Sequence, residues 1–214
     1  MRVALGCELT YDLPQPLPMI AMLNTHYSQA PFLEQPDTLT TRPAVPVESY
    51  RDGFGNWCNR LTAPAGRFSL GTSGVIRIDG MPDQVDPAAP EHAVQTLAPD
   101  TLVYLLGSRY CETDVLMEDA WRLFGSEPAG APRVQAICNH VHNHVSFGYE
   151  HSSQSWTAAQ PHAEARGGCR DCTQLAITFC RCLNIPARYC TGYISAIGPP
   201  KQTLMQDCNR RNVH

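Results

Sequence analysis

The chain has 214 residues, of which 43% are hydrophobic and 17% charged, and this composition is typical of a globular protein with a sizeable core. A formal net charge of −4 without a cluster of Lys and Arg argues against nucleic acid as a partner. The sequence contains no apolar stretch of signal-peptide or membrane-spanning length, so we expect a soluble, cytoplasmic protein with no membrane partner.

Ten cysteines raise the question of a disulfide scaffold. Such scaffolds are short chains that cannot build a core without bridges, whereas this chain is long enough to do so. We therefore expect reduced thiols.

The N-terminal part, up to about Pro99, is rich in Pro, Gly, Thr and short alternating runs. Residues 3–9 and 69–78 alternate as strands do, and Asp52-Gly53 between strand-like flanks predicts a hairpin. The sequence therefore predicts an antiparallel β domain over 1–99.

Helical periodicity begins near Thr101. Residues 114–124 place apolar side chains on one face, with Gly125 as the stop, and a second helix starts after Pro132. Phe147 and Tyr149 then alternate as in a strand. The fold class expected is α+β, with a helical segment after the β domain.

A third helix is predicted from Cys169 or Arg170 to Leu183, because apolar residues recur there at three- and four-residue steps. Asn184 can adopt a left-handed cap and Pro186 prevents continuation. Residues 187–194 then have the pattern of a strand.

Cys169 stands at the expected start of this helix. Unpaired backbone N–H groups and the helix dipole favour the thiolate there, and only the thiolate is nucleophilic. Gly167 and Gly168 are expected to leave the space above the sulfur open, so that an oxyanion could use the Cys169 amide. Asp171 is interpreted as a dipole-compensating residue and Cys172 as a small buried side chain.

Other interpretations of these residues remain open. Cys169-x-x-Cys172 with Cys180-x-Cys182 could ligate zinc or an iron–sulfur cluster, although the second spacing is unusual for zinc ribbons. A thioredoxin-like redox pair is less well supported, because no βαβ pattern precedes it. A tract of alternating histidines also looks like a metal site, but only two members share a helix face, and a structural role is favoured for His140, His142 and His144.

The segment "GGCRDCTQLAITFCRCLNIPARYCTGYI" resembles the core signature of bacterial transglutaminase-like proteins. "RVQAICNHVHNHVSFGYE" is similar to the helix that precedes the cysteine in that family, and "YRDGFGNW" to its N-terminal β domain. The resemblance implies a papain-like fold with Cys169 as the nucleophile. It also implies a cysteine protease (a hydrolase) or acyltransferase that acts on peptide or isopeptide amides through a thioester, without a cofactor.

The chain departs from the family after Pro200. Family members continue into strands that carry the histidine and aspartate of a Cys-His-Asp triad, whereas here a polar tail, 201–214, offers Asp207 and His214 in the reverse order. We therefore expect a truncated or frameshifted core over 100–200 with weak or absent activity, because general acid–base help is worth ~10²–10⁴-fold. The alternative is a non-catalytic peptide-binding or interaction module, and an exposed edge of the strand at 188–194 would favour self-association.

Overall fold

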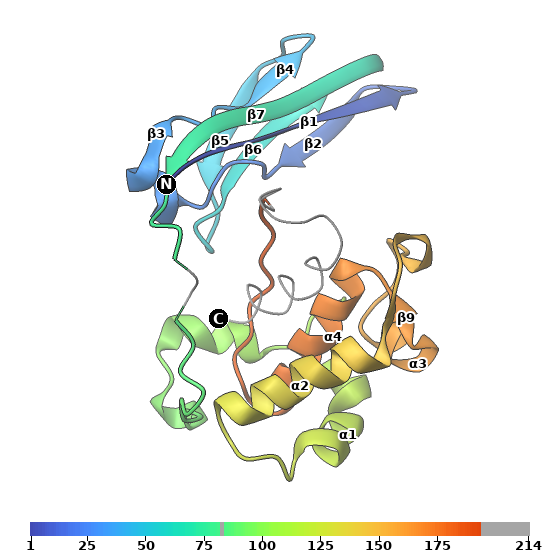
Figure 1. The fold of residues 1–214 in the computed structure, drawn as a ribbon. Helices are drawn as coiled ribbons and strands as arrows, with labels where there is room; N and C mark the ends of the chain where they lie inside the picture. Colours follow the sequence, from blue (N-terminus) through green and yellow to red (C-terminus); the bar gives the residue numbers. More distant parts are fainter. Residues whose placement is uncertain (82–83, 194–214) are drawn as a thin grey trace. The chain divides into compact units, whose positions relative to one another are not determined.

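The computed structural model describes residues 1–81 and 84–193 (Figure 1). These residues form two compact units, of which the first comprises 1–81 with 192–193 and the second 84–191. Among the described residues, no helix is both long enough and apolar enough to cross a membrane.

The first unit contains two antiparallel sheets. Strand β7 carries most of one sheet: it pairs with β1 along the whole length of both strands, and with β3 and β4 on its other side. The strands of this sheet are β1 (Arg2–Leu13), β3 (Leu33–Gln35), β4 (Thr40–Arg42) and β7 (Gly66–Arg77). The other sheet has the order β2, β6, β5, with β2 (Leu17–Ala21), β5 (Val47–Arg51) and β6 (Trp57–Ala63). The predicted antiparallel β architecture is confirmed.

The hairpin predicted at Asp52-Gly53 is confirmed, but its turn differs from the two-residue type. Arg51 pairs with Trp57, so five residues form the connection between β5 and β6. The Asp52 carboxylate accepts hydrogen bonds from the N–H groups of Phe54 and Asn56, both at 2.9 Å, and these bonds lower the pKa of Asp52 together with the bond from the Asn56 side chain. Asp52 therefore organises the turn through its side chain.

The second unit is mainly helical. Its elements are η2 (Val94–Thr96), η3 (Pro99–Leu105), α1 (Thr113–Phe124), α2 (Ala131–His144), β8 (Ser146–Phe147), η4 (Tyr149–His151), α3 (Ala159–Glu164), β9 (Arg166–Gly167) and α4 (Cys169–Cys182). One further short helix, η1 (Tyr27–Phe32), belongs to the first unit. The two helices predicted before Cys169 are confirmed as α1 and α2.

Helix α4 lies at the centre of the second unit, in contact with α1, α2 and α3 (Figure 1). Every residue from Asp171 to Cys180 is buried, so the helix is enclosed on all sides and not along one stripe. The helix begins at Cys169, as predicted, and Asn184 beyond its end has the expected left-handed conformation with φ of 61°. The α+β fold class is thus confirmed, with the cysteine at the start of a helix.

Two predicted strand segments are wrong. Residues 187–193 form no strand, because the backbone of Ala187 is bonded elsewhere: its N–H donates to the Tyr104 carbonyl and its carbonyl accepts from the Arg181 guanidinium. The exposed sheet edge expected there is therefore not observed in the described segment. Tyr149 is also outside a strand, since β8 ends at Phe147 and a 3-10 turn follows.

Candidate active site

Cys169 is the first residue of α4, and its side chain is partly exposed. Gly168 precedes it in an extended conformation, so the chain changes from strand to helix at the cysteine itself. The amides of a first helical turn have no intrahelical acceptors, and they point toward whatever approaches the helix start. The position thus combines access for a substrate with backbone donors for an oxyanion.

A buried carboxylate holds this turn. Asp171 is 0% exposed and accepts the Gly168 N–H at 2.9 Å, which caps the helix from its own third position. Its other oxygen accepts from the Arg170 guanidinium at 3.0 Å, and Arg170 also donates to the Ser153 carbonyl. Asp171 and Arg170 therefore tie the start of α4 to the preceding loop.

The two glycines before the cysteine have a different role from the one expected. A Cβ on Gly167 would lie 2.9 Å from the Cβ of Asp171, and one on Gly168 would lie 3.0 Å from the Cβ of Ser152. The space beside both glycines is filled and not open. They are needed because the chain passes closely between Asp171 and the loop at Ser152.

Tyr149 lies beside the cysteine. Strands β8 and β9 are parallel, with Phe147 opposite Gly167, and the Gly148 N–H continues the pairing to the Gly167 carbonyl at 3.0 Å. Tyr149 and Cys169 each follow this Phe147–Gly167 pair by two residues, and the Tyr149 hydroxyl is 3.8 Å from the Cys169 sulfur. The Phe147 ring contacts the Tyr149 ring edge-on at 5.2 Å between centroids, which orients the phenol.

The other cysteines of the helix do not share this environment. Cys172 is buried, as predicted, and Cys180 is completely enclosed. Burial raises the pKa of the Cys180 thiol, and it raises the pKa of Cys182 to about 11. Within residues 1–81 and 84–193, no three His, Cys, Asp or Glu side chains are grouped so as to hold a metal ion.

The histidines do not meet the cysteine in the described part of the chain. The hydrogen-bond partner found there for the Cys169 sulfur is the Tyr149 hydroxyl, and no imidazole is bonded to it. His140 and His144 stack on each other along α2, as the helical spacing predicted, while His142 is exposed. Asp207, His214 and the tail 201–214 lie outside the described residues. Trp156 is half-buried in the loop before α3.

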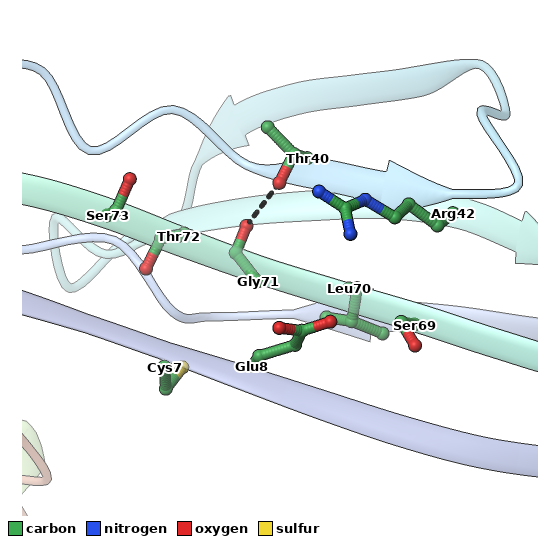
Figure 2. A pocket seen from close by; sticks show the side chains of 9 residues that line it. All are labelled: Cys7, Glu8, Thr40, Arg42, Ser69, Leu70, Gly71, Thr72 and Ser73. Carbon is green, nitrogen blue, oxygen red and sulfur yellow. Dashed lines mark hydrogen bonds between the residues drawn. The ribbon is translucent and has the colours of Figure 1, made fainter.

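Two cavities in the first unit are lined by neither Cys169, Tyr149 nor the histidines of α2. One of about 170 Å³ lies over β1, β4 and β7 and is lined by polar groups that include Glu8, Arg42 and Thr40 (Figure 2). Another of about 350 Å³ is lined mainly by apolar side chains of β1, of β2 and the residues after it, and by Leu70 of β7. These cavities therefore do not bear on the chemistry predicted for Cys169, which depends on the surroundings of the first turn of α4.

Comparison with known proteins points to one family. Residues 120–214 match the family model described as the Transglutaminase-like superfamily. A crystal structure from Cytophaga hutchinsonii, described as "a Putative Cysteine Protease", is similar with a TM-score of 0.76 and 26% sequence identity. The match covers 88% of this chain and 66% of that one, so this chain spans just under two thirds of its relative. None of the curated proteins compared matches the chain. Both matches fit a buried helix that begins at a cysteine, and they support a relationship of residues 120–214 to the transglutaminase-like superfamily.

Proposed function

We propose that the protein is a cysteine acyltransferase or peptidase in which Cys169 attacks the carbonyl carbon of a peptide or isopeptide amide. The observation that carries the proposal is the contrast along α4: Cys169 is partly exposed at the first turn, whereas Cys172, Cys180 and Cys182 are buried. The match to the transglutaminase-like superfamily and the likeness to a protein described as a cysteine protease support the same chemistry.

The chemical step balances with the groups named. The Cys169 thiolate forms an S–C bond while the carbonyl electron pair moves to oxygen; the oxyanion then re-forms the carbonyl, and the C–N bond breaks. The leaving amine takes up the proton that the thiol released, by way of solvent, and a thioester remains on Cys169. Water converts the thioester to an acid in the hydrolase reaction, and a second amine converts it to a new amide in the transfer reaction.

Two donors are available for the oxyanion. One is the Cys169 N–H in the first helical turn, and the other is the Tyr149 hydroxyl. The oxyanion forms two bonds away from the sulfur, so a hydroxyl 3.8 Å from the sulfur is within its reach. The phenol keeps its proton throughout and acts only as a hydrogen-bond donor.

We further propose that the 214-residue chain turns over amides slowly. An amine is a poor leaving group, and its departure needs a proton delivered in the transition state. No histidine bonds the Cys169 sulfur within the part of the chain that the structure describes, and the loss of such acid–base help costs ~10²–10⁴-fold. The same observation supports a second candidate function, a peptide-binding module that keeps the site without turnover.

The domain assignment follows from the same family. We propose that residues 1–99 correspond to the β domain that accompanies transglutaminase-like cores, and residues 100–200 to the core itself. The first unit supports this proposal through its two antiparallel sheets, and the second through α4 and the short β8–β9 pair.

An activated ester tests the nucleophile without a general acid. 4-Nitrophenyl acetate releases a phenolate that needs no proton, so we expect a burst of one nitrophenolate per chain and an acetyl group on Cys169, located by peptide mass spectrometry. Cys169→Ala should lose the burst, while Cys190→Ala, which removes another partly exposed thiol, should retain it. An unchanged burst in Cys169→Ala would refute the nucleophile assignment. Acetylation without any turnover of peptide amides would favour the binding module.

Tyr149→Phe should slow the acetylation step about tenfold. This loss is smaller than the ~10²–10³ found for enclosed oxyanion donors, because Tyr149 is 65% exposed. Alkylation of Cys169 by iodoacetamide forms no oxyanion, so its rate should not change in the same variant. Equal slowing of both reactions would show that Tyr149 only positions the sulfur, and no slowing of acetylation would exclude it as a donor.

A further inference from the structure

Three imidazoles form a cluster between two helices of the second unit. His140 and His144 of α2 stack with 5.1 Å between centroids and 14° between planes. His162 of α3 lies against both, with centroids 5.4 Å from His144 and 6.4 Å from His140. The cluster thus links α2 to α3 through side-chain contacts. Along the chain, β8, η4 and a loop stand between these two helices.

Within the part of the chain that the structure describes, the hydrogen bonds of the cluster leave two ring nitrogens without a partner. His144 Nε2 bonds the His162 carbonyl oxygen at 2.6 Å, and His162 Nε2 lies 3.3 Å from an Asp119 carboxylate oxygen. His140 Nε2 and His162 Nδ1 are buried, and neither has a hydrogen-bond partner among residues 1–81 and 84–193. Among the described residues, no three His, Cys, Asp or Glu side chains are grouped so as to hold a metal ion. Buried polar atoms without partners are uncommon and call for a reason.

The charges around the cluster are nearly balanced while the rings are neutral. Helix α1 contributes Asp119 and Arg122, which bond each other, and α4 contributes the uncharged Phe179. Protonation of His140 would add a positive charge to a site whose carboxylate, Asp119, already pairs with Arg122. Burial lowers the pKa of His140, and the neighbouring His144, His162 and Arg122 lower it further.

The cluster is linked to the active site through the chain. Helix α3 ends at Glu164, its cap residue Ala165 has a left-handed conformation with φ of 53°, and β9, Gly168 and Cys169 follow. At the other side, α2 leads into β8 and then Tyr149. The two strands that place the Tyr149 hydroxyl beside the Cys169 sulfur therefore start from the two helices that the histidines join.

We propose that His140, stacked on His144 and packed against His162, is the acid-sensitive element of a latch, which holds α2 and α3 together while His140 is neutral and loosens α3 and β9 when His140 is protonated. The direction follows from linkage. His140 binds a proton less readily in the packed state than in the loosened one, so the stability of the packed state is full above the ordinary histidine pKa of ~6.5 and declines as the pH falls below it. Any effect on Cys169 chemistry rests on the proposed function, whereas the loosening itself does not.

Hydrogen exchange measures the latch directly. After correction for intrinsic exchange, amides of 159–167 should exchange about tenfold faster at about pH 5 than at about pH 8 in the wild-type protein. His140→Phe keeps an aromatic ring against Phe124 and Phe179 but cannot be protonated, so its response should be much smaller. His142→Phe, an exposed position on the same helix, should retain the wild-type response.

Each alternative outcome has a separate meaning. No acid response in the wild type, or the same response in His140→Phe, would overturn the latch. Should His140→Phe fold poorly, His140→Gln provides the same test, because it also removes the His140 ring that titrates while the bond from His144 to the His162 carbonyl is left in place. These hydrogen-exchange results do not depend on acetylation of Cys169. If Cys169 were not acetylated, the exchange rates of residues 159–167 would still test the latch.

Discussion

Replacing Phe179 by alanine is expected to lower the free energy of unfolding of the helical unit by about 3–5 kcal/mol. Phe179 is 0% exposed in the middle of α4. Its ring meets Phe124 at 5.2 Å and His162 at 5.4 Å between centroids, both edge-on, so truncation removes apolar burial and leaves a cavity between three helices. Chemical denaturation followed by the helical circular dichroism signal measures the effect, because helices α1 to α4 all lie in this unit.

Two variants control for this prediction. Phe179→Leu keeps most of the apolar volume and should lose distinctly less stability than the alanine variant. Val115→Ala, at a position of α1 that is 56% exposed, should change stability by no more than about 0.5 kcal/mol. A loss in Phe179→Ala no larger than in Val115→Ala would mean that α4 is not the core of the unit.

The sequence predicts α4 well because its signal is local. Apolar residues at helical spacing, Asn184 and Pro186 fix where the helix lies and where it ends, and Cys169 falls at its start in the structure. The environment of Cys169 depends instead on neighbours that are distant in sequence. Close packing of Gly168 against Ser152 could not be predicted, because nothing in the local pattern indicates which loop covers the helix start.

The β unit shows the same division between local and distant information. The hairpin at Asp52 was predicted from its Asp-Gly pair, yet the left-handed glycine of the turn is Gly55, with φ of 87°. The turn has five residues because Asp52 bonds the N–H groups of Phe54 and Asn56. A residue pair indicated that the chain reverses, whereas the side-chain bonds decided the length of the turn.

Partners supplied by other elements account for the remaining differences. Tyr149 was assigned to a strand from its alternation with Phe147, and its place beside Cys169 comes from the parallel pairing of β8 with β9. The tract at 140–144 predicted one shared face for two histidines, but His162 joins them from α3. Strand propensity at 187–193 gave a wrong prediction, since a strand also needs a neighbour to pair with.

Asp171→Ala is expected to destabilise the helical unit by about 2–4 kcal/mol. The variant leaves the buried Gly168 N–H without its acceptor and separates Arg170 from its carboxylate. The loss could lie in the lower part of this range because the Arg170 side chain is 30% exposed, so water can replace part of its interaction with the carboxylate. Denaturation followed by the helical signal measures the loss, and the alkylation rate of Cys169 reports whether the start of α4 has also shifted.

Asp171→Asn separates the two contributions of the carboxylate. Its amide oxygen can still accept from the Gly168 N–H, whereas the ion pair with Arg170 is lost, so a smaller loss than in Asp171→Ala is expected. Equal losses in the two variants would assign the effect to the ion pair, and wild-type stability in Asp171→Ala would contradict the role given to this residue. The outcome matters for the site because Gly168 and Cys169 are adjacent: the carboxylate that caps the helix also fixes the sulfur from which any acyl transfer would begin.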